Sequence, residues 1–351
     1  MIPIARLNSL FAPINRRLLG PPKPEVEVLQ EEETETVVPP AFLPGMLERA
    51  IGTDEHSVLS DHLETATQTK VVHAPVLRYT YRNALVSRSG FATFRHIERY
   101  GNEFRTVGLS NRPIEVPELR YCHTYVAWRY FGHWLTDSIP AAFLEPDRGE
   151  LWMPPNPSWE HSPPYLEALD LTPRETEVVL AETLTVYQDY GQGSQKRARF
   201  ATILKDLHAQ FGNGGDAEET LFIKRGATGV ARTFSNEEQL LEQLSARNWR
   251  ILDVATASVE EIQKAVCQAR VVVSIDGSHL DHAHLSLRPG SVMVVLVPQD
   301  RFTLRQLGLS RAHDVSPGFV VVEGNQSDGY TVDLDEILKT VELAAAQVDR
   351  L

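Results

Sequence analysis

The sequence predicts an α/β fold. Strand-like and helix-like segments alternate from residue 217 onward, and one of the strand-like segments, Val271–Ile275, is apolar at nearly every position. Alternation of this kind is typical of a parallel sheet covered by helices, and an apolar run is typical of a strand buried on both faces. A less regular series of the same kind precedes residue 212. We therefore expect two α/β domains in tandem, the second a doubly wound parallel sheet.

The second domain has clear helix starts. Ser235 with Glu238, and Ser258 with Glu261, have the spacing of capping boxes. Between and after these helices we expect strands at 221–224, 249–254, 271–275, 291–297 and 319–322, and a closing helix from Asp333 to about 348.

The first domain is predicted from weaker patterns. We expect strands at 119–127, 151–153 and 178–187, and helices at 132 to about 145, 162–169 and 195–211. The glycine-rich stretch 211–216 is typical of a joint between domains. The expected organisation is thus an N-terminal segment with a linker at 1–40, an α/β domain at 41–212 and a Rossmann-like domain at 217–351.

The amino-acid composition argues against some classes of protein. The chain of 351 residues has 47 acidic and 34 basic residues, a formal charge of -13, which argues against a protein that binds nucleic acid by neutralising phosphates. The only cysteines are Cys122 and Cys267, so no disulfide framework or cysteine-rich metal site is expected, and a reducing compartment fits best.

The first 20 residues are apolar and basic, without an acidic residue. No apolar run reaches the roughly 18–20 residues that span a membrane, and Arg6, Arg16 and Arg17 interrupt any secretory signal. The apolar residues recur at helical spacing, so the segment is either an interfacial membrane helix or a helix docked on the protein itself. Residues 21–40, rich in glutamate and flanked by prolines, are expected to form an extended linker or a strand at a solvated edge.

Ligands of open α/β sheets bind beyond the carboxyl ends of the strands. Arg225 ends the first strand of the second domain, and Arg232 follows in a loop with glycines at 226 and 229. Guanidinium groups bind phosphate oxygens in pairs, which suits a diphosphate. A solvated loop whose arginines pair with Glu237 or Glu238 is the alternative.

The third strand of this domain ends at Asp276-Gly277-Ser278-His279. Gly277 would let backbone approach a ligand closely, and a helix beginning there would offer free N–H groups to an anion. Asp276 could instead be a simple helix cap. His279-Leu280-Asp281-His282 also matches the end of a metal-binding pattern, with His284 beyond it, but the pattern's leading histidine is Gly277 here. Metal binding, polar packing and ligand hydrogen bonding all remain open for these histidines.

In the first domain, His133 and Asp137 are four residues apart. On a helix they would share one face, and a carboxylate beside an imidazole is a workable general base for deprotonating a hydroxyl. The alternative is a pair that only stabilises the helix.

These segments together resemble glycosyltransferase family 61. Phe131–Pro140 is similar to the family's His-Trp-Leu-x-Asp-x-x-Pro segment, and the second domain is similar through Arg225, Arg232 with Asn236–Glu238, and the strand that ends near Pro298. Family members usually carry His-Gly-Ala-Gly-Leu where this sequence has Asp276 to Leu280. The resemblance covers about residues 120–300.

The resemblance implies a GT-B fold, in which two Rossmann-like domains face each other across a cleft. It implies an inverting transfer without a metal or other cofactor, from a nucleotide-sugar donor on the carboxyl domain to a glycan or lipid-linked saccharide on the amino domain. With no membrane span expected, the protein would act in the cytoplasm on a capsule-type or other polysaccharide precursor, with peripheral inner-membrane contact through residues 1–20 if these are interfacial.

The resemblance also gives roles to residues. Asp137, oriented by His133, would be the base, and Asp276 the second candidate; Arg225 and Arg232 would hold the diphosphate. The donor would also contact Asn236, Glu237, Gly277, Ser278, His279 and His282. Three other functions stay open: a polysaccharide pyruvyltransferase-like enzyme, a metal-dependent hydrolase using His279, Asp281, His282 and His284, and a non-catalytic member of the family.

Overall fold

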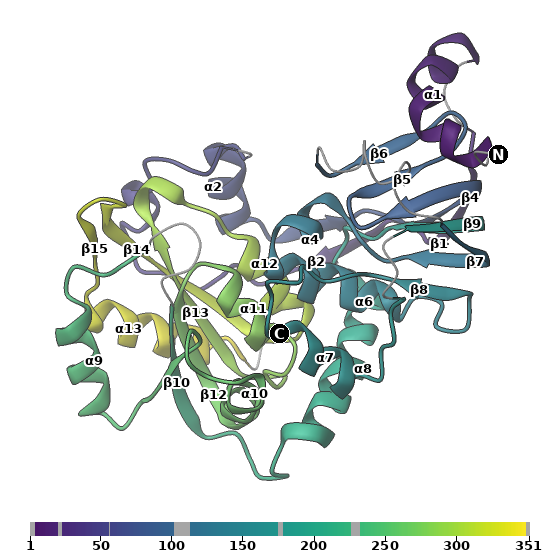
Figure 1. Ribbon diagram of the computed structural model, residues 1–351. Helices are drawn as coiled ribbons and strands as arrows, with labels where there is room; N and C mark the ends of the chain where they lie inside the picture. The colour runs from purple at the N-terminus through teal and green to yellow at the C-terminus, as the bar shows by residue number, and fades with distance from the viewer. Residues whose placement is uncertain are drawn as a thin grey trace. The chain divides into compact units, whose positions relative to one another are not determined.

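The computed structural model describes residues 4–19, 23–55, 57–101, 113–174, 178–225 and 232–348. The chain forms two compact units, each built from two stretches of sequence (Figure 1). Unit 1 comprises Met1–Glu33 and His73–Gly191, and unit 2 comprises Thr34–Val72 and Gln192–Leu351. The structure confirms the α/β class. The domain boundaries expected from the sequence, with the roles attached to them, stay predictions.

Unit 1 contains a mixed sheet in the order β6-β5-β4-β9-β7-β8, with β1 added beside β4. Strands β7, β8 and β9 are parallel, whereas β1, β5 and β9 are antiparallel to β4 and β6 is antiparallel to β5. The parallel sheet implied for this half is therefore only partly present. The strands are β1 (Glu25–Gln30), β4 (Val76–Ser87), β5 (Gly90–Ala92), β6 (Ile97–Arg99), β7 (Ile114–Tyr121), β8 (Glu150–Trp152) and β9 (Val178–Gln188).

The helix α1 (Ile4–Leu19) packs against β4, β5 and β6 of this sheet. Ala12 is buried, and the amide of Asn15 donates to the carbonyl of Phe94 at 3.0 Å, whereas Leu18 and Leu19 are exposed. Strand β1 is mostly exposed, as expected of a solvated edge. Within the described part of the chain, no helix is long and apolar enough to span a membrane.

The short helices of unit 1 are α4 (Tyr125–Arg129), α5 (Phe131–His133), α6 (Ile139–Ala142) and α7 (Ser162–Ala168). The strand expected at 119–127 ends at Tyr121 instead, because Thr124 accepts a hydrogen bond from the Ala127 N–H and starts α4.

The helix expected from 132 to about 145 is interrupted by a π-helical turn, Trp134–Ser138, between α5 and α6. Pro140 has no N–H to bond the carbonyl of Thr136, and its ring would collide with that carbonyl in a regular helix. The Thr136 hydroxyl donates to the Gly132 carbonyl at 2.9 Å within the same turn. Insertions of this kind occur often at functional sites.

Unit 2 confirms the doubly wound sheet. Its strands run in the order β11-β10-β12-β13-β14-β15, and all are parallel except β15, which forms a hairpin with β14. Strand β12 is nearly all buried, as its apolar sequence predicts. The strands are β10 (Glu219–Lys224), β11 (Arg250–Asp253), β12 (Ala269–Ile275), β13 (Val292–Pro298), β14 (Ser316–Asn325) and β15 (Gly329–Thr331).

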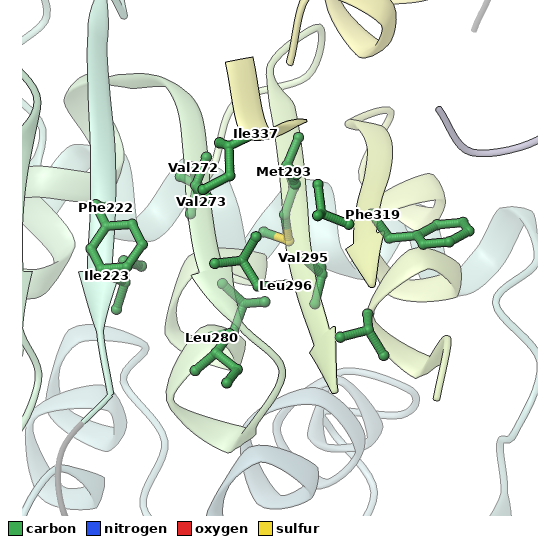
Figure 2. Close-up of a cluster of buried hydrophobic side chains, with 14 of the residues drawn as sticks. Phe222, Ile223, Val272, Val273, Leu280, Met293, Val295, Leu296, Phe319 and Ile337 are labelled. Atoms are coloured by element: carbon green, nitrogen blue, oxygen red, sulfur yellow. The ribbon is translucent and has the colours of Figure 1, made fainter. Parts of the chain in front are cut away.

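Helices cover the sheet of unit 2. Helix α13 packs on β13 and β14, while α8 contacts both α10 and α12. The apolar core of unit 2 includes Phe222, Val273, Met293 and Ile337, which are labelled in Figure 2. The helices are α8 (Ser194–Phe211), α9 (Glu237–Ser245), α10 (Val259–Gln268), α11 (Asp281–His284), α12 (Arg305–Ala312) and α13 (Leu334–Ala345).

One of the two expected capping boxes forms. Ser258 and Glu261 cap α10 reciprocally. The box expected from Ser235 and Glu238 is wrong, because the Ser235 hydroxyl bonds the Tyr330 carbonyl and α9 begins one residue later, after Asn236.

An early segment completes unit 2. Ala41 forms a parallel bridge with Gly318 of β14, and the Arg49 guanidinium makes two hydrogen bonds with the Glu336 carboxylate of α13, at 2.9 and 2.7 Å. The segment includes a 3-10 turn (Leu47–Arg49) and α2 (Leu59–Thr67), and β2 (Glu33–Thr36) pairs with β3 (Lys70–His73).

Candidate active site

The strand order of unit 2 reverses between β10 and β12. From β10 the chain first adds β11 on one side and then crosses to add β12, β13 and β14 on the other. Ligands of open α/β sheets bind in the crevice outside the carboxyl ends of the strands at such a point. Arg225 directly follows β10, and Asp276 directly follows β12. The structure thus brings these two predicted residues to one edge of the sheet.

Both arginines contact Asp276. Arg225 and Arg232 each donate through Nη1 to the Asp276 backbone carbonyl, and Arg232 Nη1 also lies 2.9 Å from the Asp276 carboxylate oxygen Oδ2. Arg232 and Asp276 are buried, so the alternative of a solvated loop does not hold for Arg232. The predicted glycines 226 and 229 lie outside the described residues.

Burial and the neighbouring positive charges lower the pKa of Arg225. Desolvation, followed by repulsion from Arg232, lowers the pKa of Arg225 from 12.5 to about 10, and attraction by Asp276 offsets part of that shift. The group remains protonated at neutral pH. A partly buried cation beside a second cation is a favourable place for an anion, because each phosphate oxygen that binds relieves repulsion between the arginines.

Gly277 makes the close approach possible. Its φ of 156° is a conformation that residues with side chains rarely adopt. A Cβ at this position would overlap the Arg225 guanidinium and come within 2.9 Å of His279 Nδ1. The N-cap of the following 3-10 turn, Ser278–Leu280, is Gly277 rather than Asp276, so the helix-cap alternative for Asp276 is not what the structure shows.

The imidazole of His279 contacts the Ser274 side chain of β12. Its Nε2 lies 2.7 Å from the Ser274 hydroxyl, while its Nδ1 is buried without a hydrogen-bond partner. Burial, and then the charges of Arg225 and Arg232, keep the pKa of His279 well below its usual value of 6.5. The imidazole is therefore neutral at physiological pH.

The remaining predicted donor residues make contacts within unit 2. The Asn236 side chain donates to the Val332 carbonyl at 2.8 Å and accepts from the Val332 N–H at 3.1 Å. Glu237 lies 3.2 Å from Lys224 rather than beside either arginine. Ser278 opens the 3-10 turn, and His282 is buried in α11, where its carbonyl accepts from Gln263.

The structure adds residues that the sequence patterns did not reveal. His62, on α2, interacts electrostatically with Asp276, and its Nε2 is buried without a hydrogen-bond partner. Burial lowers the pKa of His62, although Asp54, Asp61 and Asp276 oppose the shift. Arg301, beyond the carboxyl end of β13, adds to the repulsion on Arg225. The rule about carboxyl ends could have found Arg301, whereas no local pattern places His62 here.

The histidine cluster does not assemble into a metal centre. Asp281 is paired with Arg305 at 2.8 Å, and His284 Nε2 lies 2.7 Å from the Gln306 side chain. Across the described ranges, no group of three or more His, Cys, Asp or Glu side chains could hold a metal ion. The contacts of these side chains thus fit polar packing, with His279 facing the arginines.

In unit 1, the structure brings His133 and Asp137 together as predicted. The His133 Nδ1 lies 2.7 Å from the Asp137 Oδ2, and about a quarter of each side chain is exposed. The Tyr130 ring contacts His133. Burial raises the pKa of Tyr190, and the charges of Glu98 and Asp137 add to that shift. An imidazole in contact with a solvent-accessible carboxylate can orient that carboxylate toward a hydroxyl.

Comparison with known proteins relates these features to a family. A family model described as Glycosyltransferase 61 matches residues 131–294. The resemblance to glycosyltransferase family 61 is confirmed. The matched region of this glycosyltransferase family starts just before His133 and ends in β13, so it contains the His133–Asp137 pair, both arginines and the loop after β12.

No curated protein matches the chain. Among solved structures, the flavodiiron protein from Giardia intestinalis is similar at 10% identity and a TM-score of 0.25, over 49% of this chain and 43% of that one. The match therefore spans less than half of that structure, and a likeness this weak carries no conclusion about fold or function.

Proposed function

We propose that this family 61 protein is an inverting, metal-independent glycosyltransferase that uses a nucleotide-sugar donor. The observation that carries the proposal is the content of the region matched by the family: an arginine pair at the reversal point of a doubly wound sheet, and a carboxylate–imidazole pair. The arginine pair can bind a leaving diphosphate, and the carboxylate–imidazole pair can deprotonate an acceptor hydroxyl.

The donor would bind at the carboxyl ends of β10 and β12. Arg225 and Arg232 would bind the diphosphate, and their charges would stabilise the negative charge that develops on it as the sugar departs. The Arg232 guanidinium already contacts the Asp276 carboxylate, so a diphosphate would share Arg232 with that carboxylate. Gly277, Ser278 and His279 would line the nucleotide or the sugar.

The acceptor hydroxyl would react next to Asp137. Its oxygen forms a bond to the anomeric carbon from the face opposite the diphosphate, and the bond between that carbon and the diphosphate oxygen breaks. The hydroxyl proton passes to Asp137, which His133 orients. Asp276, whose carboxylate forms an ion pair with Arg232, remains the second candidate base.

The finer features of the proposal follow from the resemblance. We propose a GT-B arrangement of donor and acceptor domains, and a glycan or lipid-linked saccharide acceptor such as a capsule-type precursor. We also propose action in the cytoplasm, with peripheral contact to the inner membrane through the N-terminal helix.

Calorimetric titration with UDP, GDP, CDP, ADP and dTDP, in the presence of a chelator, tests the proposal. At least one nucleoside diphosphate should bind without metal, and Arg225→Ala should weaken it by about 1.5–3 kcal/mol, the range for a hydrogen bond to a charged group. Arg247→Ala, at an exposed position just after α9, is the matched control and should change nothing. Absence of binding by every nucleotide, or equal affinity of the Arg225→Ala protein, would contradict the proposed donor site.

A further inference from the structure

A chain of two hydrogen bonds runs from the sheet of unit 2 to His279. The Ser274 hydroxyl lies 2.6 Å from the Ile223 carbonyl oxygen of β10, the neighbouring strand. The same hydroxyl oxygen lies 2.7 Å from His279 Nε2. A serine hydroxyl has one hydrogen, and a carbonyl oxygen can only accept. The hydrogen of Ser274 therefore points to Ile223, and its oxygen accepts from His279.

This direction fixes the tautomer of His279. Because Nε2 must carry the hydrogen that Ser274 accepts, Nδ1 of the neutral ring carries none and is a hydrogen-bond acceptor. In the described part of the chain, Nδ1 is buried and has no hydrogen-bond donor. Leaving a buried acceptor unsatisfied is costly, so such an atom suggests a ligand.

The surroundings of Nδ1 indicate which ligand. The Arg225 guanidinium lies against Gly277, and a Cβ on Gly277 would come within 2.9 Å of His279 Nδ1. The acceptor therefore lies beside the arginine that would bind the diphosphate. A ligand that reaches both must carry a hydrogen-bond donor close to an anionic group. In a nucleotide sugar, the hydroxyl groups of the ribose and of the transferred sugar meet that requirement.

We propose that His279 Nδ1 accepts a hydrogen bond from a donor hydroxyl, on the ribose or on the sugar, and that Ser274 is the positioning residue that presents Nδ1 for it. This inference rests on the proposed function. Phosphate oxygens that bind Arg225 would draw its guanidinium away from Gly277 and uncover Nδ1. The rival explanation is that Nδ1 only supports the side chain of Arg225.

The tautomer can be tested without any substrate. In protein labelled with ¹⁵N in its histidines, the His279 ring should show a hydrogen on Nε2 and none on Nδ1 at pH 7. Ser274→Ala removes the acceptor of that hydrogen, so the Nδ1–H form should increase, and Ser274→Thr, which keeps the hydroxyl, should restore the original tautomer. A hydrogen on Nδ1 in the unaltered protein would overturn the inference.

Three probes test the contact. Inorganic pyrophosphate has no hydroxyl on carbon, a nucleoside diphosphate from the series above adds the ribose hydroxyls, and its glucose derivative adds those of a sugar. His279→Gln keeps an amide near Nε2 for Ser274 but places no acceptor at Nδ1. The variant should leave pyrophosphate binding unchanged and lower the affinity for a hydroxyl-bearing probe about three- to tenfold, the effect of one neutral hydrogen bond.

The probes that lose affinity show whether the contact is to the ribose or to the sugar, and whether Nδ1 only supports the side chain of Arg225. A loss with the nucleoside diphosphate assigns the contact to the ribose, and a loss only with its glucose derivative assigns it to the sugar. An equal loss for pyrophosphate would show that His279 acts through Arg225, and no loss with any probe would show that Nδ1 makes no contact; either result overturns the inference alone. Failure of all three probes to bind the unaltered protein would instead overturn the proposed function.

Discussion

Arg232 and Asp276 form a buried ion pair, with 2.9 Å between Arg232 Nη1 and Asp276 Oδ2 and 8% of each side chain exposed. The pair joins the loop after β10 to the end of β12. It gives Arg232 a structural role in addition to the proposed diphosphate contact. The two roles can be separated by measuring stability and binding on the same variants.

Arg232→Ala should lower the free energy of unfolding by about 3–5 kcal/mol, because it leaves the Asp276 carboxylate buried without its partner. Urea unfolding at pH 7 measures the change. Adding Asp276→Asn to the same protein removes the unpaired charge and should recover part of the loss. Equal stability of Arg232→Ala and the unaltered protein would mean that water compensates the carboxylate in solution.

Asp137→Asn should reduce transfer by about 10²–10⁴-fold, the usual contribution of a positioned base, because an amide cannot accept the acceptor's proton. Nucleoside diphosphate affinity should not change, since the proposed donor site lies in unit 2. Turnover of the nucleotide sugar by the paired variants Asp137→Asn and Asp276→Asn measures the effect. Near-full activity of Asp137→Asn together with an inactive Asp276→Asn would move the base to unit 2.

Stability should fall as the pH drops below about 6.5, because several buried histidines stay neutral in the folded protein. Burial lowers the pKa of both His123 and His284 to about 3. Between pH 6.5 and about 3 the unfolded chain takes up a proton at each of these positions and the folded chain does not. Each histidine should therefore lower the free energy of unfolding by about 1.4 kcal/mol per pH unit in that window.

His123→Phe tests this dependence, because both ring nitrogens of His123 lack hydrogen-bond partners in the described structure and its ring is packed against Tyr100 and Tyr121. In a plot of unfolding free energy against pH, the slope between pH 6 and 4 should decrease by the amount that corresponds to about one proton. His161→Gln, at a partly exposed position before α7, is the control. An unchanged slope in His123→Phe would show that this histidine is already protonated in the folded protein.

The exposed end of α1 should bind anionic membranes. Leu18 is 75% exposed and Leu19 56%, and the exposed Arg16 and Arg17 precede them. Apolar and basic side chains together favour an interface with anionic lipid. Replacing both leucines by serine should abolish cosedimentation with vesicles of phosphatidylglycerol while changing the unfolding free energy by less than about 0.5 kcal/mol.

Deleting residues 1–20 is the comparison for that experiment, because it also removes buried Ala12 and the contact of Asn15 with Phe94. A lower melting temperature of the deletion, without vesicle binding by the unaltered protein, would show that α1 is only a docked structural helix.

Local patterns predicted the elements of unit 2 because those elements depend on local causes. The buried part of strand β12 is apolar except for Ser274, and Ser258 and Glu261 cap α10 within one turn. The long strand β4 gave no such signal. Asn83, with a φ of 51°, is left out of the pairing of β4 with β9, although the register is the same on both sides of it. Burial along β4 does not alternate, because the first half is mostly part-buried and the last four residues, 84–87, are all buried.

The sequence predicted several residues of the candidate site, but not the contacts that they make with residues far away in the chain. Arg225 and Asp276 follow from the carboxyl ends of parallel strands, and the His133–Asp137 contact follows from their spacing. The burial of Arg232 depends on a carboxylate 44 residues away, and His62 reaches Asp276 from a segment expected in the other domain. Ser274 gives no sequence signal, since the carbonyl closest to its hydroxyl, that of Ile223 at 2.6 Å, belongs to the neighbouring strand.

Unit 2 is built from two stretches of sequence that are far apart in the chain, and this determines when its contacts can form during synthesis. Arg49 leaves the ribosome 287 residues before its partner Glu336, and Ala41 similarly precedes Gly318. At about 5–20 residues per second, this early segment spends roughly 15–60 s without these two contacts. The larger stretch of unit 1, His73–Gly191, is made within that interval. The nascent chain must therefore keep Thr34–Val72 accessible while unit 1 is made, and unit 2 can close its core only when α13 emerges.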